Sequence, residues 1–360
     1  MSETNPADPA ARSAPDGPKE GRTRAKHHLA ARIEDAVHRW RQRRARKRGR
    51  VNTILPYTGY GSPGWIRVLA RVVLAKPDAN AVQRAEKVRG WRSFLSVPTD
   101  DTILRVRVGD RHFQVPIDRG GVVDAHVDVP LTPGWHAIDL SVAEAEPVSA
   151  QVFVIDPQER FGLISDVDDT VWVTALPRPL VAAWNTFIVD EHARIQVSGM
   201  SVLYERIRRQ HPGAPIIYLS TGAWNIAPTL RRFLTRNLFP PGPFLLTDWG
   251  PTHDRFFRNG KEHKRNQLRR LAEEFPGVRW LLFGDDGQHD EAIYAEFASE
   301  HPRSVAAVCI RQLSTGEAVL AGGRKRAADR EAQSPVRWFF APDGAGLLEQ
   351  LIGAGIITNR

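Results

Sequence analysis

The segment FGLISDVDDTVW at residues 161–172 decides the fold class of this chain. Its first five residues form a short apolar run, which predicts a buried strand, and the carboxylates of Asp166, Asp168 and Asp169 follow at once. Carboxylates this close repel one another unless a cation such as Mg²⁺, which prefers oxygen ligands, neutralises them. Ligands bind at the carboxyl ends of strands in open α/β sheets. The segment therefore predicts a polar site at a strand end, whereas an acidic turn with helix-capping aspartates is the alternative.

Three later segments repeat this arrangement. The strand predicted at 216–220 ends in Ser220, whose hydroxyl can hold a phosphoryl oxygen, and Gly222 then permits close backbone approach. An amphipathic helix predicted at 260–276 carries Lys264 in its first turns. Residues 278–294 predict a further apolar strand followed by acids, and 305–311 predict a fourth strand. These acids, which can complete a metal site, are Asp285, Asp286 and Asp290.

In order, these elements resemble the haloacid dehalogenase superfamily of phosphotransferases, with DxDxT, a strand-terminal Ser or Thr, a Lys and then GDxxxxD. A finer resemblance, over roughly residues 155–345, is to the actin-patch-associated phosphatidate phosphatase family. The segments that carry it are DVDDTV, LSTGAWN, FPPGPFLLTDWG, GKEHK and FGDDGQHDEAIY. The resemblance implies a Rossmann-like parallel sheet, and the preceding β-rich segment also resembles what bacterial members place before this domain.

The resemblance also implies roles for individual residues. Asp166 would attack phosphorus, and Asp168 would protonate the leaving oxygen and later activate water. Mg²⁺ would bind the Asp166 carboxylate, the Asp168 carbonyl oxygen and Asp285. Ser220 and Lys264 would stabilise the transferring phosphoryl group.

The remaining polar residues of these motifs leave alternatives open. Asp290 would orient Lys264, which we favour, or hold the metal through water. Asp169 and Asp286 are surface acids, helix caps or catalytic groups. Trp224 lines the pocket or packs in the core, and Asn225 binds substrate or caps the next helix. The substrate-binding segment comprises Thr221, Gly222, Trp224 and Asn225.

The net charge of +9 is concentrated in one segment. Residues 22–50 carry a net +10, whereas residues 51–360 are nearly neutral. Residues 26–50 predict a basic amphipathic helix with an apolar stripe ending at Trp40. Such a helix can bind an anionic membrane, bind nucleic-acid phosphates, or pack its stripe on the protein body.

The rest of the chain sets the domain organisation. Residues 1–25 have the composition of a disordered segment. Residues 51–155 contain short alternating runs, which predict an antiparallel sandwich-like accessory domain, and residues 156–360 form the predicted catalytic domain.

The only cysteine, Cys309, excludes a disulfide framework and lies in an apolar strand, so we expect it to be buried. No apolar run is long enough to span a bilayer, and no secretory leader is evident, so we expect a cytoplasmic protein that can lie peripherally at a membrane.

The motifs and the family resemblance together predict a Mg²⁺-dependent phosphatase that forms an aspartyl-phosphate. Phosphatidate is the favoured substrate because of the resemblance and the basic amphipathic helix. The inserts between motifs are too short for a separate cap domain, although residues 176–200 can form a short helical cover. The alternatives are a phosphatase of soluble, protein or nucleic-acid phosphomonoesters and a non-catalytic membrane-binding scaffold.

Overall fold

A computed structural model describes most of the chain. The described residues are 36–37, 39–76, 97–100, 102–143, 145–173, 194–247, 253–287, 289–320, 334 and 336–358. The predicted disordered segment 1–25, the first ten residues of the predicted basic helix and most of the predicted cover at 176–200 lie outside this set. The chain divides into two compact units, residues 1–48 and 49–360.

The described part of the first unit is helical at residues 36–37 and 39–47. The Arg44 guanidinium lies over the Trp40 ring, 5.5 Å from its centroid. This cation–π contact covers one face of an exposed tryptophan on an otherwise cationic helix. What the helix binds stays a prediction.

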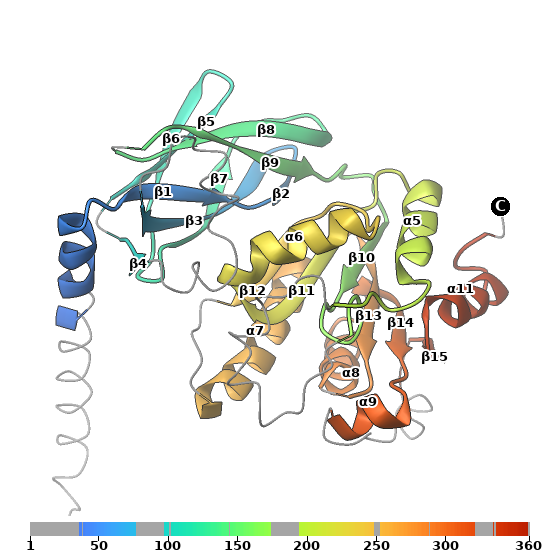
Figure 1. The fold of residues 1–360 in the computed structure, drawn as a ribbon. Coiled ribbons are helices and arrows are strands. Elements are labelled where there is room, and N and C mark those ends of the chain that lie inside the picture. Colours follow the sequence, from blue (N-terminus) through green and yellow to red (C-terminus); the bar gives the residue numbers. More distant parts are fainter. Residues whose placement is uncertain are drawn as a thin grey trace, which may run out of the picture. The chain divides into compact units, whose positions relative to one another are not determined.

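The second unit begins with a β-rich part that surrounds its own apolar core. Its strands are β1 (Val51–Pro56), β2 (Gly59–Ser62), β3 (Trp65–Ala75), β4 (Val97–Pro98), β5 (Leu104–Val108), β6 (Arg111–Val115), β7 (Val122–Asp128), β8 (Gly134–Ser141) and β9 (Val148–Val154). All their pairings are antiparallel among the described residues except that of β2 with β9. In β5, buried and exposed residues alternate, because successive side chains point to opposite faces of a strand. The long β3 pairs with β1 and β2 along one edge and with β7 and β4 along the other, and this joins the strands into one folded sheet (Figure 1).

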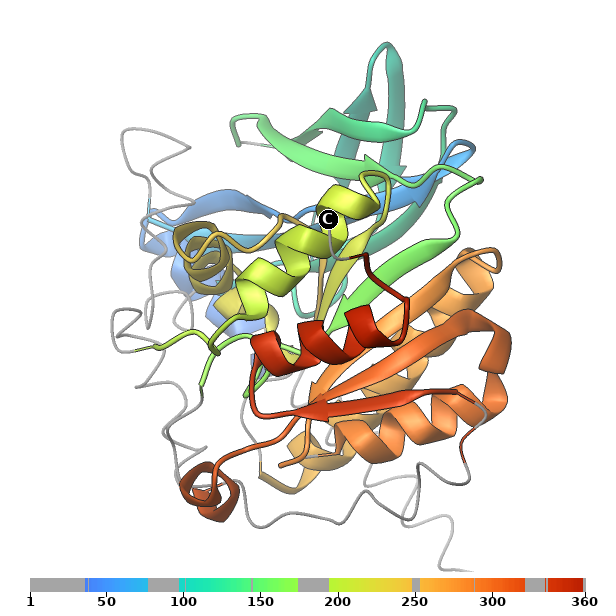
Figure 2. The same ribbon diagram turned by 90° about the vertical axis from the view of Figure 1, so that its right-hand side faces the viewer.

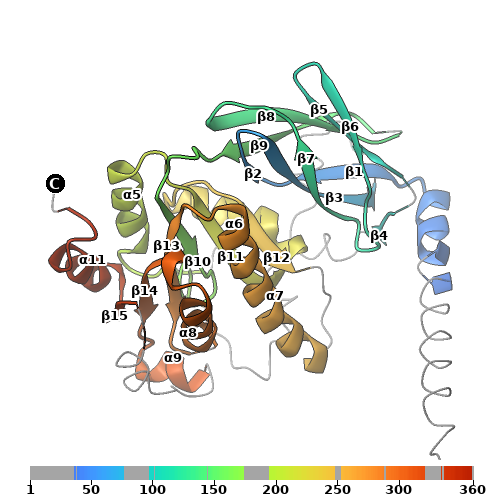
Figure 3. The same ribbon diagram turned by 180° about the vertical axis from the view of Figure 1, so that it is seen from behind.

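The remainder of this unit is a parallel sheet covered by helices on both faces. Its strands, in spatial order, are β12 (Phe244–Thr247), β11 (Ile216–Ala223), β10 (Phe161–Ser165), β13 (Arg279–Asp285), β14 (Val305–Arg311) and β15 (Trp338–Ala341). Its helices are α5 (Met200–Gln210), α6 (Ala227–Arg236), α7 (His253–Glu274), α8 (Asp290–Glu300), α9 (Thr315–Leu320) and α11 (Gly344–Gly353), with short 3-10 turns at Trp224–Ile226 and Pro302–Ser304. Figure 2 shows α5 and α11 in front of the sheet, and Figure 3 shows α7 and α8 on its other face.

Strand order reverses direction at the centre of this sheet. The chain runs outward from β10 through β11 to β12, then crosses back to pair β13 with the other edge of β10. Helices that leave neighbouring strands toward opposite faces open a crevice at the strands' carboxyl ends, and ligands of open α/β sheets bind there. The motif carboxylates of residues 161–172 follow β10 directly at this point.

Charged side chains join the β-rich part to α7. The Arg67 guanidinium donates to Glu274 through Nε at 3.1 Å and through Nη2, and to Asp124 through Nη1 at 2.9 Å. Arg270 donates to the other Asp124 oxygen at 2.7 Å, and the Tyr60 hydroxyl donates to Glu274 at 2.9 Å. Because these groups are largely shielded from water, their charge-assisted hydrogen bonds fix α7 against the β-rich part.

The structure differs from the sequence predictions at four elements. Strand β11 runs to Ala223, so Ser220 lies inside the strand and does not end it. Strands β12 and β15 were not predicted, because each is only four residues long and lacks a periodic pattern of its own. Helix α7 begins at His253 rather than at residue 260, which places Lys264 in the middle of the helix and not in its first turns. Cys309 is fully buried in β14, as expected. Among the described residues, no helix combines the length and the hydropathy that crossing a membrane requires.

Candidate active site

The first motif forms a tight loop after β10. The Asp166 N–H donates to the Phe283 carbonyl of β13 at 2.9 Å, so the sheet ladder continues one residue beyond the strand. Val167 and Val171 are fully buried, and the Val171 N–H donates to the Val167 carbonyl at 2.9 Å. Asp169 has φ of 57°, a left-handed conformation that aspartate tolerates better than most residues. Two buried valines and a ladder bond therefore hold the acidic loop at the end of the strand.

Both carboxylate oxygens of Asp168 accept hydrogen bonds. The Trp172 indole Nε1–H donates to Oδ1 at 2.9 Å, and the Ser220 hydroxyl donates to Oδ2 at 3.1 Å. The Ser220 oxygen in turn accepts the Gly222 N–H at 2.9 Å, which leaves its own hydrogen to point at Asp168. The first two motifs therefore meet, with Asp168 and Ser220 in direct contact and both buried.

Lys264 lies between two carboxylates in the centre of the site. Its Nζ donates to Asp166 Oδ1 at 2.6 Å and to Asp290 Oδ1 at 2.5 Å, and all three side chains are at least 95% buried. Burial disfavours the ammonium ion, but the two adjacent carboxylates outweigh this and raise the pKa of Lys264 above its usual value. Lys264 therefore stays protonated and is held in place. Asp290 contacts it directly, as we expect if Asp290 orients Lys264.

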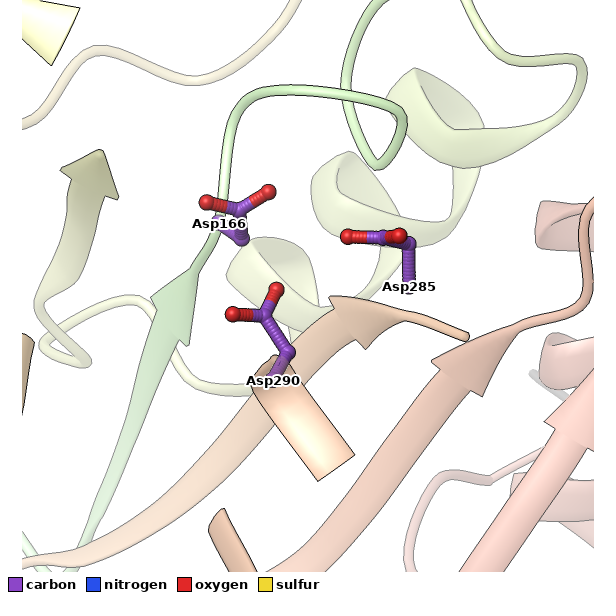
Figure 4. Close-up of side chains that lie close together, drawn as sticks. All are labelled: Asp166, Asp285 and Asp290. Carbon is purple, nitrogen blue, oxygen red and sulfur yellow. The ribbon is translucent and has the colours of Figure 1, made fainter. Parts of the chain in front are cut away.

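Three carboxylates converge beside this lysine. Asp166, Asp285 and Asp290 each bring an oxygen to within 4.8 Å of the others, at the ends of β10 and β13 and the start of α8 (Figure 4). Burial and then the neighbouring Asp290 raise the pKa of both Asp166 and Asp285 well above the usual carboxyl range. Among the described residues, Asp166 Oδ2 and Asp290 Oδ2 are buried without a hydrogen-bond donor. One lysine cannot neutralise three buried carboxylates, so the donor set fits a hard divalent cation.

The predicted metal set and the observed cluster overlap in Asp166 and Asp285. The third carboxylate of the cluster is Asp290, while the third predicted ligand was the backbone carbonyl of Asp168. The Asp168 side chain is not part of this cluster, since its two carboxylate oxygens contact Trp172 and Ser220. The carboxyl group can therefore exchange a proton without also binding a metal at this cluster. The Asp285 Oδ1 atom accepts the Gly287 N–H at 2.7 Å, and this bond fixes the turn after β13.

Asp169 is buried and is therefore not a surface acid, and neither Asp169 nor the half-buried Asp286 caps a helix, which corrects these predicted roles. The Asp169 side chain is buried, and its carbonyl accepts a hydrogen bond from Arg311 Nη1 at 2.9 Å. The Asp286 side chain accepts the Leu313 N–H at 2.8 Å, and its own N–H donates to the Arg311 carbonyl at 3.1 Å. Both residues therefore tie the motif loops to the end of β14.

The segment after Ser220 packs against other parts of the protein. Trp224 is 4% exposed and stacks on Tyr57, with the ring centroids 4.5 Å apart, so its packing role is the one observed. Helix α6 starts after Ile226 without a side-chain cap, so Asn225 does not cap it. The Thr221 carbonyl accepts a hydrogen bond from the Thr247 hydroxyl at 3.0 Å. Gly222 allows Ile226 to approach, because a Cβ there would lie 2.4 Å from the Ile226 side chain.

Sequence reasoning missed Trp172 and Arg311. Trp172 is buried and holds Asp168, and Arg311 is buried at the end of β14 and holds the Asp169 carbonyl. Each carries a weak sequence signal. Trp172 follows the acidic motif directly, and Arg311 is a charged residue that ends an otherwise apolar strand. A buried arginine needs acceptors, and Arg311 also donates to Glu317 at 2.7 Å.

Comparison with known proteins points to the same part of the chain. Residues 161–312 match the family model of the phosphatidate phosphatase APP1 catalytic domain. This range contains every predicted site residue, from Asp166 to Asp290, but less than half of the chain.

Two curated fungal proteins are similar over comparable lengths. Phosphatidate phosphatase APP1 of Saccharomyces cerevisiae is 28% identical over 154 residues, which are 42% of this chain and 25% of that protein. An uncharacterised protein of Schizosaccharomyces pombe is 24% identical over 177 residues, which are 48% of this chain and 29% of that protein. The chain thus spans between a quarter and a third of the length of these relatives.

A carbohydrate acetylesterase from Xanthomonas citri is among the solved structures found by similarity of fold. It shares 9% identity at a TM-score of 0.27, with 76% of this chain and 73% of that chain covered. At this TM-score, the similarity carries no argument about fold or function.

Proposed function

We propose that this chain is a phosphatase that hydrolyses a phosphomonoester through an aspartyl-phosphate, on a sheet of the haloacid dehalogenase type. The observation that carries the proposal is Lys264, buried between Asp166 and Asp290 and beside Asp285 at the ends of β10 and β13. The match of residues 161–312 to a phosphatase family model supports a phosphatase enzyme. A non-catalytic scaffold would gain nothing from such a cluster, because burying uncompensated carboxylates destabilises the fold.

Asp166, Asp168, Ser220 and Lys264 each have a separate role in the proposed reaction. A carboxylate oxygen of Asp166 attacks phosphorus, and the bond from phosphorus to the leaving oxygen breaks as Asp168 delivers a proton to that oxygen. Asp168 then takes a proton from water, the water oxygen attacks phosphorus, and inorganic phosphate leaves as the Asp166 carboxylate is restored. Lys264 holds negative charge that spreads over the phosphoryl oxygens, and the Ser220 hydroxyl can turn from Asp168 to donate to one of them.

We propose Mg²⁺ as the cation of this site. Asp166, Asp285 and the Asp168 carbonyl would hold it, while Asp290 orients Lys264 and faces the same cluster. Bound there, Mg²⁺ would supply positive charge against the phosphoryl oxygens. The oxygen-only donor set suits Mg²⁺ better than metals that prefer thiolate or imidazole ligands.

We propose phosphatidate as the substrate. The proposal rests on the printed function of the yeast relative and on the cationic helix at residues 39–47. That helix belongs to residues 26–50, which would place the enzyme peripherally at an anionic membrane surface. Soluble sugar, protein or nucleic-acid phosphomonoesters are the competing substrates.

Phosphate release tests each part separately. The full chain should release phosphate from phosphatidate vesicles with Mg²⁺ and not with EDTA, and Asp166→Asn should lower the rate at least 10³-fold. Asp128→Asn is the matched control, because this aspartate is 90% exposed in the β-rich part. Full activity of Asp166→Asn would refute the nucleophile. Release only from sugar phosphates, phosphopeptides or nucleic-acid ends would refute the lipid substrate and leave the chemistry standing.

A further inference from the structure

A groove of about 830 Å³ lies at the end of the parallel sheet opposite to the carboxylates. Its lining comes from the end of β1 and the turn after it, from β8, β9, α5 and α6, and from the loop that leads into β12. It includes Trp135, Leu234, Leu238, Phe239 and Phe244. The volume falls within the usual range of small-molecule sites. The lining is mostly apolar, with arginines among it.

Leu238 lines this groove in an unfavourable backbone conformation and with its apolar side chain exposed to water. It has φ of 58° and follows the end of α6, where the Phe239 N–H donates to the Leu234 carbonyl at 2.9 Å. Glycine or asparagine is preferred at this left-handed position of a helix end. The Leu238 side chain is also 79% exposed. A leucine here is unfavourable both for backbone conformation and for hydration, which local folding does not explain.

A second exposed hydrophobic side chain lies on the same groove. Trp135 of β8 is 45% exposed and packs one side against Phe153, with centroids 4.9 Å apart. Leu238 and Trp135 therefore present apolar surface from the two parts of the unit toward one cavity. An apolar chain that entered the groove would contact both side chains.

The charged residues that line the groove are three arginines and one glutamate. Glu205 accepts hydrogen bonds from Arg208 at 2.7 and 2.8 Å and from Arg209 at 2.8 Å. The bond from Arg208 is the main cause that lowers the pKa of Glu205 to about 2, so this carboxylate stays ionised. With Arg231, the four side chains leave a net charge of +2. A phosphomonoester carries a charge of about −1.5 to −2 at pH 7, which matches this excess better than a carboxylate does.

We propose that the groove binds a lipid with one acyl chain and a phosphomonoester head group. The acyl chain lies against Leu238, Trp135 and the apolar floor, and the phosphate lies at the arginines. Of these, Arg231 donates to the Pro56 carbonyl at 3.1 Å through Nη2 rather than to Glu205. Arginine suits this role because its planar guanidinium donates to two phosphate oxygens at once.

This site is separate from the catalytic one. The loop residue Gly242 lies against the carbonyl of Ile216, the first residue of β11, whereas the catalytic hydroxyl belongs to Ser220 of the same strand. Four residue steps along the strand separate them, ~13 Å at the usual rise. The groove and the carboxylates lie at opposite ends of the sheet, so a lipid in the groove is not positioned for hydrolysis.

Titration calorimetry of the full chain with oleoyl lysophosphatidate below its micelle concentration tests the proposal. The Asp166→Asn variant in EDTA prevents turnover and leaves the catalytic site without its cation. Variants of the groove then report whether the lipid binds there, and we expect one groove site per chain. Leu238→Asn and Arg231→Glu should each weaken it about tenfold or more, because each removes a contact with one end of the lipid.

Matched controls separate this effect from misfolding. Asparagine tolerates a positive φ, so Leu238→Asn should fold at least as stably as the parent chain in thermal unfolding. Val202→Asn, at an exposed valine of α5 outside the groove, and Arg303→Glu, at an exposed arginine, should bind as tightly as the parent.

Three outcomes overturn the proposal. They are no binding of the lysophosphatidate, equal binding by the groove and control variants, and equal affinity for oleate, which would refute the phosphate head group. The binding readout does not depend on activity. A failure of the proposed phosphatase would instead appear as absent phosphate release from parent chains that still bind the lipid.

Discussion

Replacing Lys264 by methionine should destabilise the metal-free protein by about 3–5 kcal/mol. The change keeps a linear side chain of similar size but removes a cation that lies 2.6 Å from Asp166 and 2.5 Å from Asp290. Both carboxylates are almost completely buried, so water cannot replace the lost charge. Breaking a buried ion pair costs this much because the remaining charge is left uncompensated.

Urea unfolding at pH 7 in EDTA measures the effect, with Lys76→Met as control because Lys76 is exposed. The control should stay within about 0.5 kcal/mol of the parent. The double variant Lys264→Met, Asp290→Asn should be more stable than the sum of the single changes predicts, by about 1–3 kcal/mol, since it removes one uncompensated charge.

Magnesium gives a second readout. The remaining carboxylates attract a divalent cation more strongly without the lysine, so Mg²⁺ should raise the unfolding midpoint more in Lys264→Met than in the parent. Phosphate release should nevertheless fall about 10²- to 10³-fold, as expected when a group that stabilises transition-state charge is removed. An unfolding midpoint equal to the parent's in EDTA would refute the reasoning that Lys264 compensates these charges.

Three further predictions concern other contacts. Arg67→Met should lower stability by about 2–3 kcal/mol in urea unfolding, because the Glu274 carboxylate loses its charged donor, and an unchanged midpoint would contradict this. Burial lowers the pKa of His263 to about 4, so its contribution to stability is present above pH 6.5 and is lost as pH falls toward 4. Between pH 7 and 5, the parent should therefore lose about 2 kcal/mol more than His263→Gln, and equal losses would refute the cause. Gly162→Ala should cost about 1–3 kcal/mol in thermal unfolding, since its Cβ would lie 2.5 Å from the Trp280 ring, and an unshifted transition would show that the ring can move.

The local pattern of apolar residues was enough to predict two strands of the parallel sheet that holds the candidate site. The apolar runs at Phe161–Ser165 and Val305–Arg311 are strands with the predicted bounds, because a buried parallel strand needs an uninterrupted apolar sequence. The short alternating runs predicted within residues 51–155 likewise form strands. The short strands β12 and β15 were not predicted. Four residues are too few to show a periodic pattern of apolar residues, and the strands that pair with them are distant in sequence.

The sequence by itself determined which side chains are the candidate site residues. Asp166, Asp168, Ser220 and Asp290 each end or follow an apolar run, and Lys264 lies on an amphipathic one. The roles predicted for them come from the family resemblance.

Only the tertiary structure decided how these groups are paired. Lys264 bridges Asp166 and Asp290, and Trp172 and Ser220 hold Asp168. Arg311 of β14 holds the loop that carries Asp166 and Asp168. The physical reason is that periodicity reports burial, whereas pairing depends on strand order and on which buried charges come within hydrogen-bonding distance of each other. The position of the exposed Leu238 also depends on tertiary structure, since no local sequence pattern shows that it faces a groove completed by β8.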